Sequence, residues 1–576
     1  MRNIITKIIT TIMAVTMAFT FTACGAGNSG SGTTTEIRIM SKGGGYGRTW
    51  IDAAAARFAE LKKNESYEEG KTGVTFKIDS QLDTGVSTMA SSGYSIYFAT
   101  TEAGSVSSLV AKGNLLDIND IVTAKTAMPD GSTESVEDRI LPEYRNSFKA
   151  SDGHYYAVPH FSDYPAISYD IERFIEGGFY LADPSDANTN KELYTAGDIG
   201  SAYFIKPGTN TGKSCGNDGV FGTEDDGLPT SVIEFLVMCA RMEDKGVIPM
   251  TISGQLISYL VYFEEALWAS LGGKKEIDTL FDYDGTMEVV KVDADENIIY
   301  TDEPIFNFFP SIKKPETEVI TITNSNGYRV NDSYARYVAF AITEIMESYG
   351  WFSGDSSNEN ISHTMAQKRF ITNGYGNVPK MAMFIEGSYW YNEAKDHNAF
   401  RDYTIVSGKA DKQLGFMVMP TAIYDSVTDE TNARGNTIFS TGIGKAFINA
   451  NISGNEGLVR ACKDFLQFCY TSEEIINQFS VSGAYRLGLD YNKIGLNDSA
   501  VQGLSDWQKS FYNVLKIADM VGARREFELE VFYPTLQGKK YTSILTAMRA
   551  NANIKAKDCF DASRIRSKKW GGDMVI

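Results

Sequence analysis

Apolar and polar residues follow the periods of strands and helices early in the chain. Residues 36–40 alternate as a strand does, and apolar side chains over residues 50–61 recur at helical spacing. Residues 74–78 and 94–99 predict a second and a third strand, and residues 106–112 predict a short helix. Strands that alternate with helices predict a parallel α/β sheet with helices on both faces.

Helices dominate the second half of the chain. Residues 171–176 predict a short helix, and Pro229-Thr230 predict the cap of another that carries apolar residues at helical spacing. Residues 334–349 and 456–470 are strongly amphipathic, and the Thr-Ser-Glu-Glu sequence of residues 471–474 has capping-box spacing. No repeat of 20–50 residues is present, which argues against a repeat architecture.

The predicted sheet also indicates where a ligand would bind. In parallel α/β sheets, ligands lie beyond the C-terminal ends of the strands. This rule places Tyr46, in a glycine-rich loop, and the turn of Thr100, Thr101 and Glu102 at the expected site. Two alternatives stay open, since Tyr46 could belong to the core and Glu102 could cap the following helix. Trp50 is expected in the core because of its helical spacing.

The N-terminus has the features of an export signal. Arg2 and Lys7 flank the start of an apolar run over residues 8–21 that is too short to span a bilayer. The following Phe21-Thr22-Ala23-Cys24-Gly25 resembles the lipobox of bacterial lipoproteins, with Phe21 in place of the usual leucine. The resemblance implies a signal peptide over residues 1–23 and acyl chains such as palmitate on Cys24. The alternative is an ordinary cleavage site in which Cys24 is only a small residue.

A tether and an exported body are expected after the signal. Residues 24–35 are small and polar and predict a flexible coil. No later segment offers eighteen uninterrupted apolar residues, so we expect the body to lie outside the cell, held by lipid on the outer face of the cytoplasmic membrane. The net charge of −19 argues against nucleic acid as a partner. Cys462 and Cys469 are expected to be buried thiols rather than a disulfide framework.

Six sets of short sequences occur along the chain in an order that resembles a known family. They are Leu109-Val-Ala-Lys-Gly-Asn-Leu-Leu-Asp117; Tyr156-Ala-Val-Pro159 with Ser168-Tyr-Asp170; Pro229-Thr230 with Gly246-Val-Ile-Pro249; Leu267-Trp-Ala-Ser-Leu-Gly-Gly273; Met381-Ala-Met-Phe-Ile-Glu-Gly-Ser-Tyr-Trp390; and Lys463-Asp-Phe-Leu-Gln-Phe468 with Thr471-Ser-Glu-Glu474. The family is the extracellular solute-binding proteins of ABC importers, in particular the carbohydrate-binding group that includes the maltose-binding proteins. Residues 274–325 do not match, so an insertion is expected there.

The resemblance implies a two-lobed, type II periplasmic-binding-protein-like α/β fold, with hinged lobes and a ligand cleft between them. Residues 36–160 and 411–470 are expected to form the N-terminal lobe, and residues 161–410 and 471–576 the C-terminal lobe. The implied function is that of a monomeric binding protein, not an enzyme. It would capture an oligosaccharide and deliver it to the membrane permease subunits of an ABC importer.

Sugar binding requires flat aromatic faces for the C–H groups of the ring and fixed polar groups for its hydroxyls. The resemblance places Thr100, Thr101 and Glu102 at polar sugar contacts. It adds a set of aromatic and acidic residues at the cleft, namely Asp163, Tyr164, Trp268, Glu386, Tyr389 and Trp390. Trp268 and Trp390 fit a lobe interface equally well.

A second constellation is local. The segment from Asn217 to Gly227 gathers Asp218, Asp225 and Asp226 among glycines, as a calcium ion requires. It resembles the Asp-Gly-rich calcium loops of extracellular proteins, although it lacks the spacing of an EF-hand. The alternatives are a structural calcium ion and a solvated acidic turn.

Two other functions stay open. A surface-anchored glycoside hydrolase would need only two carboxylates, for which Glu264, Glu265 or Glu386 could serve. A receptor of the same fold could also take a peptide or another solute, because one fold serves many ligands. The segment 208–214 imitates a phosphate-binding loop but has one residue too few between its glycines.

Overall fold

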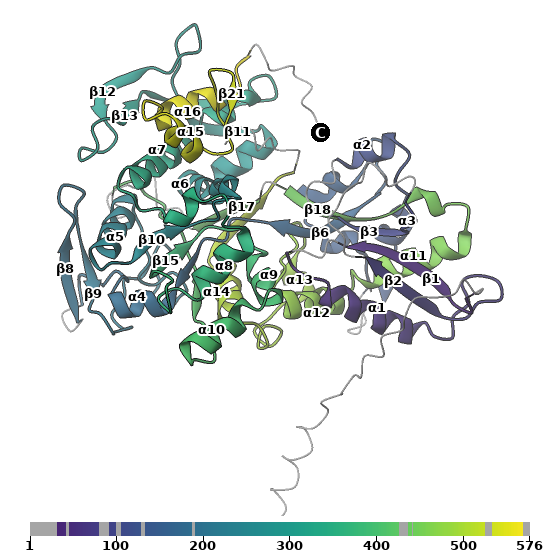
Figure 1. Ribbon diagram of the computed structural model, residues 1–576. Helices are drawn as coiled ribbons and strands as arrows, with labels where there is room; N and C mark the ends of the chain where they lie inside the picture. Colours follow the sequence, from purple (N-terminus) through teal and green to yellow (C-terminus); the bar gives the residue numbers. More distant parts are fainter. Residues whose placement is uncertain are drawn as a thin grey trace, which may run out of the picture.

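Two β-sheets, each in its own lobe, organise the chain in the computed structural model (Figure 1). The structure describes residues 32–41, 45–79, 92–99, 105–127, 133–186, 190–424, 436–440, 442–524 and 533–567. Cys24 and the turn of Thr100, Thr101 and Glu102 lie outside the described residues, so the predictions for them stay predictions. Within those ranges, no helix has the length and apolar character needed to cross a membrane.

The N-terminal lobe contains a five-stranded sheet of order β2-β1-β3-β18-β6. Its strands are β1 (Thr35–Ser41), β2 (Val74–Asp79), β3 (Ile96–Phe98), β6 (Val158–Asp163) and β18 (Gly442–Ile448). Strand β1 pairs in parallel with β2 and β3, whereas β18 pairs antiparallel with β3 and β6. The local pattern predicted the first three strands correctly. It could not predict the antiparallel strand, which comes from a distant part of the chain.

Helices cover the N-terminal sheet (Figure 1). They are α1 (Thr49–Leu61), α2 (Val106–Ala111), α3 (Asn119–Thr123), α11 (Glu456–Phe468), α12 (Ser472–Ser482) and α13 (Tyr491–Ile494). Trp50 and Phe58 of α1 are buried, which confirms the core position expected from their helical spacing. Cys462 and Cys469 are buried free thiols, as predicted.

The C-terminal lobe contains a four-stranded sheet of order β10-β15-β7-β16. Its strands are β7 (Ser168–Asp170), β10 (Ile248–Thr251), β15 (Met381–Phe384) and β16 (Leu414–Phe416). Around it lie α4 (Ile171–Gly177), α5 (Val232–Asp244), α6 (Leu260–Asp282), α7 (Tyr334–Ser348), α8 (His363–Ile371), α9 (Trp390–Asp396), α10 (Ala399–Ser407), α14 (Asp506–Val514), α15 (Ile544–Ala550) and α16 (Ala556–Ser563). The N-cap of α5 is Ser231 in a capping box with Glu234, one residue beyond the predicted Pro229-Thr230.

Short strands and turns complete the fold. The strands are β4 (Thr126–Ala127), β5 (Thr133–Glu134), β8 (Lys191–Thr195), β9 (Ser201–Ile205), β17 (Asn436–Ser440), β19 (Ala518–Gly522), β20 (Thr535–Leu536) and β21 (Lys539–Lys540). The 3₁₀ turns are Glu137–Arg139, Pro142–Phe148, Ile257–Tyr259, Gly327–Asp332, Gly354–Ser357 and Ala450–Ile452.

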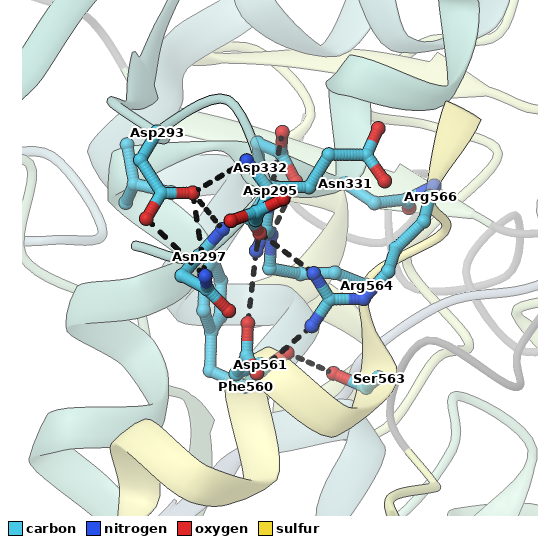
Figure 2. Close-up of polar contacts among 12 residues, drawn as sticks. Asp293, Asp295, Asn297, Asn331, Asp332, Phe560, Asp561, Ser563, Arg564 and Arg566 are labelled. Atoms are coloured by element: carbon cyan, nitrogen blue, oxygen red, sulfur yellow. Dashed lines mark hydrogen bonds and ion pairs between the residues drawn. The ribbon is translucent and has the colours of Figure 1, made fainter. Parts of the chain in front are cut away.

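The segment that matched no family pattern forms two antiparallel strand pairs on the C-terminal lobe. Strand β11 (Gly285–Val290) pairs with β14 (Thr317–Ile322), and β12 (Tyr300–Pro304) pairs with β13 (Lys313–Pro315). The end of the chain fastens this segment (Figure 2). Arg564 pairs with Asp332 at 2.7 Å, and Arg564 and Arg566 donate to the Glu296 carbonyl at 3.0 and 2.6 Å. The insertion therefore belongs to the C-terminal lobe.

The two hydrophobic cores divide the chain differently from the predicted boundaries at two places. Residues 411–424 and 436–440 contribute to the C-terminal core, because β16 pairs with β7 and β17 packs on α6. Residues 471–494 contribute to the N-terminal core, because α12 packs on α1. Arg57 of α1 adds a bidentate pair with Glu474 of α12 at 2.7 and 2.5 Å.

The chain crosses between the lobes three times. It leaves β6 at Asp163, passes from β17 into β18, and returns between α13 and α14. The first two crossings touch, because Ser440 Oγ donates to the Asp163 carbonyl at 2.5 Å. This contact fixes the point at which the lobes meet.

Candidate ligand-binding site

Tyrosines and carboxylates gather where the first crossing leaves the N-terminal lobe. The chain after β6 forms an antiparallel bridge between Pro165 and Gly387, and the Ser388 N–H donates to the Tyr164 carbonyl at 3.0 Å. The segment that follows β15 therefore lies directly against the crossing. We call Tyr46, Asp163, Tyr259, Tyr262, Glu265, Glu386, Ser388 and Tyr389 the interlobe cluster.

Tyr46 brings the N-terminal lobe into this cluster. Its hydroxyl lies 2.5 Å from Ser388 Oγ and 3.2 Å from the Ser162 carbonyl, to which it donates. Gly45 precedes it with a φ of +71°, and a Cβ added there would lie 3.0 Å from the Cβ of Tyr389. A glycine is required for this close approach between the lobes. The structure thus places two of the predicted residues, Tyr46 and Tyr389, side by side.

Asp163 is held by a tyrosine of the C-terminal lobe. Tyr262, near the start of α6, donates to Asp163 Oδ2 at 2.6 Å, and its oxygen lies 3.5 Å from the Tyr389 hydroxyl. A Cβ on Gly387 would lie 2.5 Å from the Tyr389 ring, 2.7 Å from Asp163 Oδ1 and 2.8 Å from the Tyr262 hydroxyl. Gly387 is therefore needed for space at the centre of the interlobe cluster.

Two further carboxyl groups of the interlobe cluster are buried. Glu386 is 0% exposed and Glu265 is 1% exposed. Burial raises the pKa of Glu386 well above its ordinary value, and the charges of Glu393 and Asp163 raise it further. Burial likewise raises the pKa of Glu265, with added contributions from Asp163 and Glu264. Burial therefore opposes ionisation of both carboxyl groups.

The remaining predicted aromatic residues lie in the C-terminal core. Trp390 is fully buried and its indole N–H donates to Ser168 Oγ at 3.0 Å. Trp268 is fully buried and donates to Glu276 Oε1 at 2.8 Å. The Tyr164 ring stacks on Phe511 with centroids 4.4 Å apart. A ligand-binding role for these three residues stays a prediction, and their packing favours the core alternative for the tryptophans.

The loop from Asn217 to Gly227 is organised by its own hydrogen bonds. The Asp225 carboxylate accepts the backbone N–H groups of Asn217 and Asp218 at 2.7 and 3.0 Å, and the Thr223 hydroxyl at 2.9 Å. Asp226 accepts the Gly222 N–H at 2.8 Å. In the part of the chain that the structure describes, no group of three or more His, Cys, Asp or Glu is placed to hold a metal ion. The calcium prediction stays untested.

A hollow lies in the C-terminal lobe, and no member of the interlobe cluster lines it. It has a volume of about 570 Å³ and lies beside Gly273, where α6 kinks with a φ of +72°. Strand β11, helix α7 and the paired residues Thr437 and Asp519 of β17 and β19 complete its wall. The insertion thus shapes a cavity that the sequence analysis did not foresee.

Sequence reasoning missed Tyr259, Tyr262 and Ser388, and it considered Glu265 only for hydrolysis. The available signal is the three-residue spacing of Tyr259, Tyr262 and Glu265 across the N-cap and first turns of α6, because residues three apart share one helix face. The sequence alone does not show that this helix face contacts Asp163, because that contact depends on the fold.

Three solved structures are similar to the chain. A chitin oligosaccharide binding protein gives a TM-score of 0.52 at 12% identity, over 92% of this chain and 98% of its own. The binding protein RafE of Streptococcus pneumoniae, in complex with raffinose, gives 0.52 at 10% identity, over 93% and 100%. A structure from work on xylan utilization by Caldanaerobius polysaccharolyticus gives 0.50 at 12% identity, over 92% and 99%.

The chain has the fold of the solute-binding proteins. This result confirms the predicted two-lobed, type II periplasmic-binding-protein-like fold. No family model and no curated protein matches the sequence. In this solute-binding fold the interlobe cluster occupies the junction of the lobes, because its members come from the first crossing, from the loop after β1 and from the C-terminal lobe.

Proposed function

We propose that the protein is a receptor that captures a carbohydrate between its lobes and delivers it to the membrane permease of an ABC importer. The observation that carries this proposal is the interlobe cluster, in which tyrosines and carboxyl groups from both lobes meet at the crossing. The similar solved structures include a chitin oligosaccharide binding protein and a raffinose complex, which supports a saccharide ligand.

The chemistry of the interlobe cluster suits a sugar. Tyrosine rings present apolar faces to the C–H groups of a pyranose, and their hydroxyls exchange hydrogen bonds with those of the ligand. Asp163 and Glu386 supply carboxyl oxygens beside Tyr262 and Tyr389. Opening of the lobes would separate Tyr46 from Ser388 and admit the ligand.

We further propose that acyl chains on Cys24 hold the receptor on the outer face of the cytoplasmic membrane. The lipobox resemblance and the small, polar residues 24–35 support this arrangement. A polar tether of this composition leaves the lobes free to approach a permease. The receptor would act as a monomer, since each chain carries both lobes.

A saccharide array with thermal-shift readout tests the function. Binding should raise the melting temperature, because a ligand that binds only the folded state stabilises it by mass action. The sugar should be recovered intact by chromatography. A control incubation with polysaccharides measures reducing ends, and their release would show a hydrolase instead. Failure of every saccharide to shift the melting temperature, combined with a shift by peptides, would contradict the carbohydrate assignment.

A further inference from the structure

Glu265 and Glu386 are buried acids of the interlobe cluster that lack a cationic partner. Neither oxygen of Glu386 has a hydrogen bond of normal geometry within the described residues, and the same holds for Glu265 Oε1. The Gly387 N–H and the Gln367 side chain act on the Glu386 carboxyl and lower its pKa, but the effect of burial is larger. No lysine, arginine or histidine of the described chain forms an ion pair with either residue. Burying an unpaired carboxylate is costly, so these groups need a proton or a cation.

The groups around Glu265 and Glu386 add negative charge and do not neutralise it. Asp163 lies close to both acids and raises the pKa of each. The neighbouring acids Glu393 and Glu264 do have cationic partners, because His363 lies 3.6 Å from Glu393 and the Arg336 charge lowers the pKa of Glu264 against the larger effect of burial. The interlobe cluster therefore has an excess of acid over base.

Aromatic rings surround the same acids. The rings of Tyr259, at the N-cap of α6, and Tyr262, in its first turn, lie with centroids 5.5 Å apart. Burial raises the pKa of Tyr259 and Tyr389, and the nearby Glu386 carboxyl adds to both shifts. Carboxylates combined with the electron-rich faces of tyrosine rings form a favourable environment for an ammonium group.

We propose, on the basis of the carbohydrate-binding function above, that the preferred ligand is an amino sugar with a free ammonium group that pairs with Glu386. Glu265 and Asp163 add to the favourable field, and the tyrosines pack on the sugar ring. A neutral saccharide would leave the buried acids without a counter-charge. The free amine, rather than the hydroxyl pattern alone, therefore decides selectivity.

Proton release gives this proposal a signature. Burial raises the pKa of both carboxyl groups and so opposes their ionisation in the free protein. An ammonium group favours the ionised form, so binding expels protons to the solvent. A neutral sugar provides no charge that would drive this release.

Isothermal titration of the full chain with two matched tetrasaccharides tests the inference. One is the glucosamine tetramer and the other is the same tetramer with every amine acetylated. We expect the free amine to bind at least tenfold more tightly, with proton release detected in buffers of different ionisation enthalpy. Glu386→Gln should reduce the preference to below threefold. Glu344→Gln, which alters another buried acid of the same lobe, should preserve it.

The outcomes separate this inference from the function on which it rests. Equal or tighter binding of the acetylated tetramer or of raffinose would overturn the inference and leave carbohydrate binding intact. Binding of spermidine without binding of any saccharide would overturn both. Circular dichroism checks that Glu386→Gln is folded. If it is not, the test rests on Glu265→Gln and on the number of protons that the unaltered chain releases on binding. Release of no protons would overturn the inference.

Discussion

The hydroxyl of Tyr46 in the N-terminal lobe lies 2.5 Å from Ser388 Oγ in the C-terminal lobe. Both hydroxyls also lie within reach of the Ser162 carbonyl, at 3.2 Å from Tyr46 and 3.5 Å from Ser388. The contact joins the loop after β1 to the segment after β15. Any opening of the lobes has to break it.

Replacing Tyr46 by Phe should shift the unliganded protein toward an open form. Loss of this hydrogen-bonded contact costs about 1 kcal/mol, which corresponds to a roughly fivefold change in the lobe equilibrium. Small-angle scattering without ligand should show a larger radius of gyration. Tyr67→Phe is the matched control, because Tyr67 donates to Asp464 within one lobe. Identical scattering of Tyr46→Phe and the unaltered chain would refute the role of the contact.

Gly387→Ala should disrupt the interlobe cluster. The added Cβ would overlap the Tyr389 ring and Asp163, and overpacking of this kind costs about 1–3 kcal/mol. We expect a lower melting temperature and a loss of at least tenfold in ligand affinity by titration. Gly454→Ala serves as the control, because its Cβ would meet nothing within 4 Å. Unchanged affinity in Gly387→Ala would exclude the interlobe cluster as the binding site.

Trp390 provides a test of core against ligand contact. Trp390→Ala should destabilise the protein by about 3–5 kcal/mol, because it empties a fully buried position. Trp390→Phe should lose the bond to Ser168 and lower the melting temperature, while sugar affinity stays within twofold. A large affinity loss in a well-folded Trp390→Phe protein would instead support the ligand-binding prediction.

The pH dependence of stability follows from the buried acids. The folded-state pKa values of Glu265 and Glu386 lie above the ordinary value of 4.5, so the folded chain holds more protons than the unfolded chain. Their stabilising contribution is present below pH 4.5 and is lost as the pH rises through the folded-state pKa values. The Glu265→Gln, Glu386→Gln double variant should lose less stability than the unaltered chain as the pH rises above 4.5. Denaturation curves that show the same loss of stability with pH for both proteins would contradict this role of the two acids.

Asp225 should stabilise the folded chain through its hydrogen bonds. Asp225→Ala leaves the Asn217 and Asp218 N–H groups without their acceptor, which costs about 1–3 kcal/mol. Thermal unfolding should show this loss equally with calcium and with a chelator. A melting temperature of the unaltered chain that falls on chelation would favour the calcium alternative instead.

The sequence predicted local elements well because their signals are local. The strand over Val74–Asp79 and the helices over Tyr334–Ser348 and Glu456–Phe468 were predicted to within two residues at each end. Their periodicity alone determines them. Strand β18 lacked such a signal, because its antiparallel pairing with β3 and β6 depends on chain segments far away.

The interlobe cluster was only partly predictable. Tyr46, Asp163, Glu386 and Tyr389 were found through loop position and family resemblance. Trp390 was placed with them because aromatic residues beside glycine and serine suit a ligand and a core alike. Only the packing distinguishes the two, since the Trp390 ring meets Phe384 and Trp507 at centroid distances of 5.2 and 5.7 Å.

Strand β6 stands at the edge of its sheet, and β18 is its neighbour there. The ribosome completes β6 long before it reaches β18, so the N-terminal sheet cannot close until most of the polypeptide has been synthesised. Such pairing across a long sequence separation gives a high contact order and slow folding. A nascent chain built in this way therefore completes its N-terminal sheet only late in synthesis.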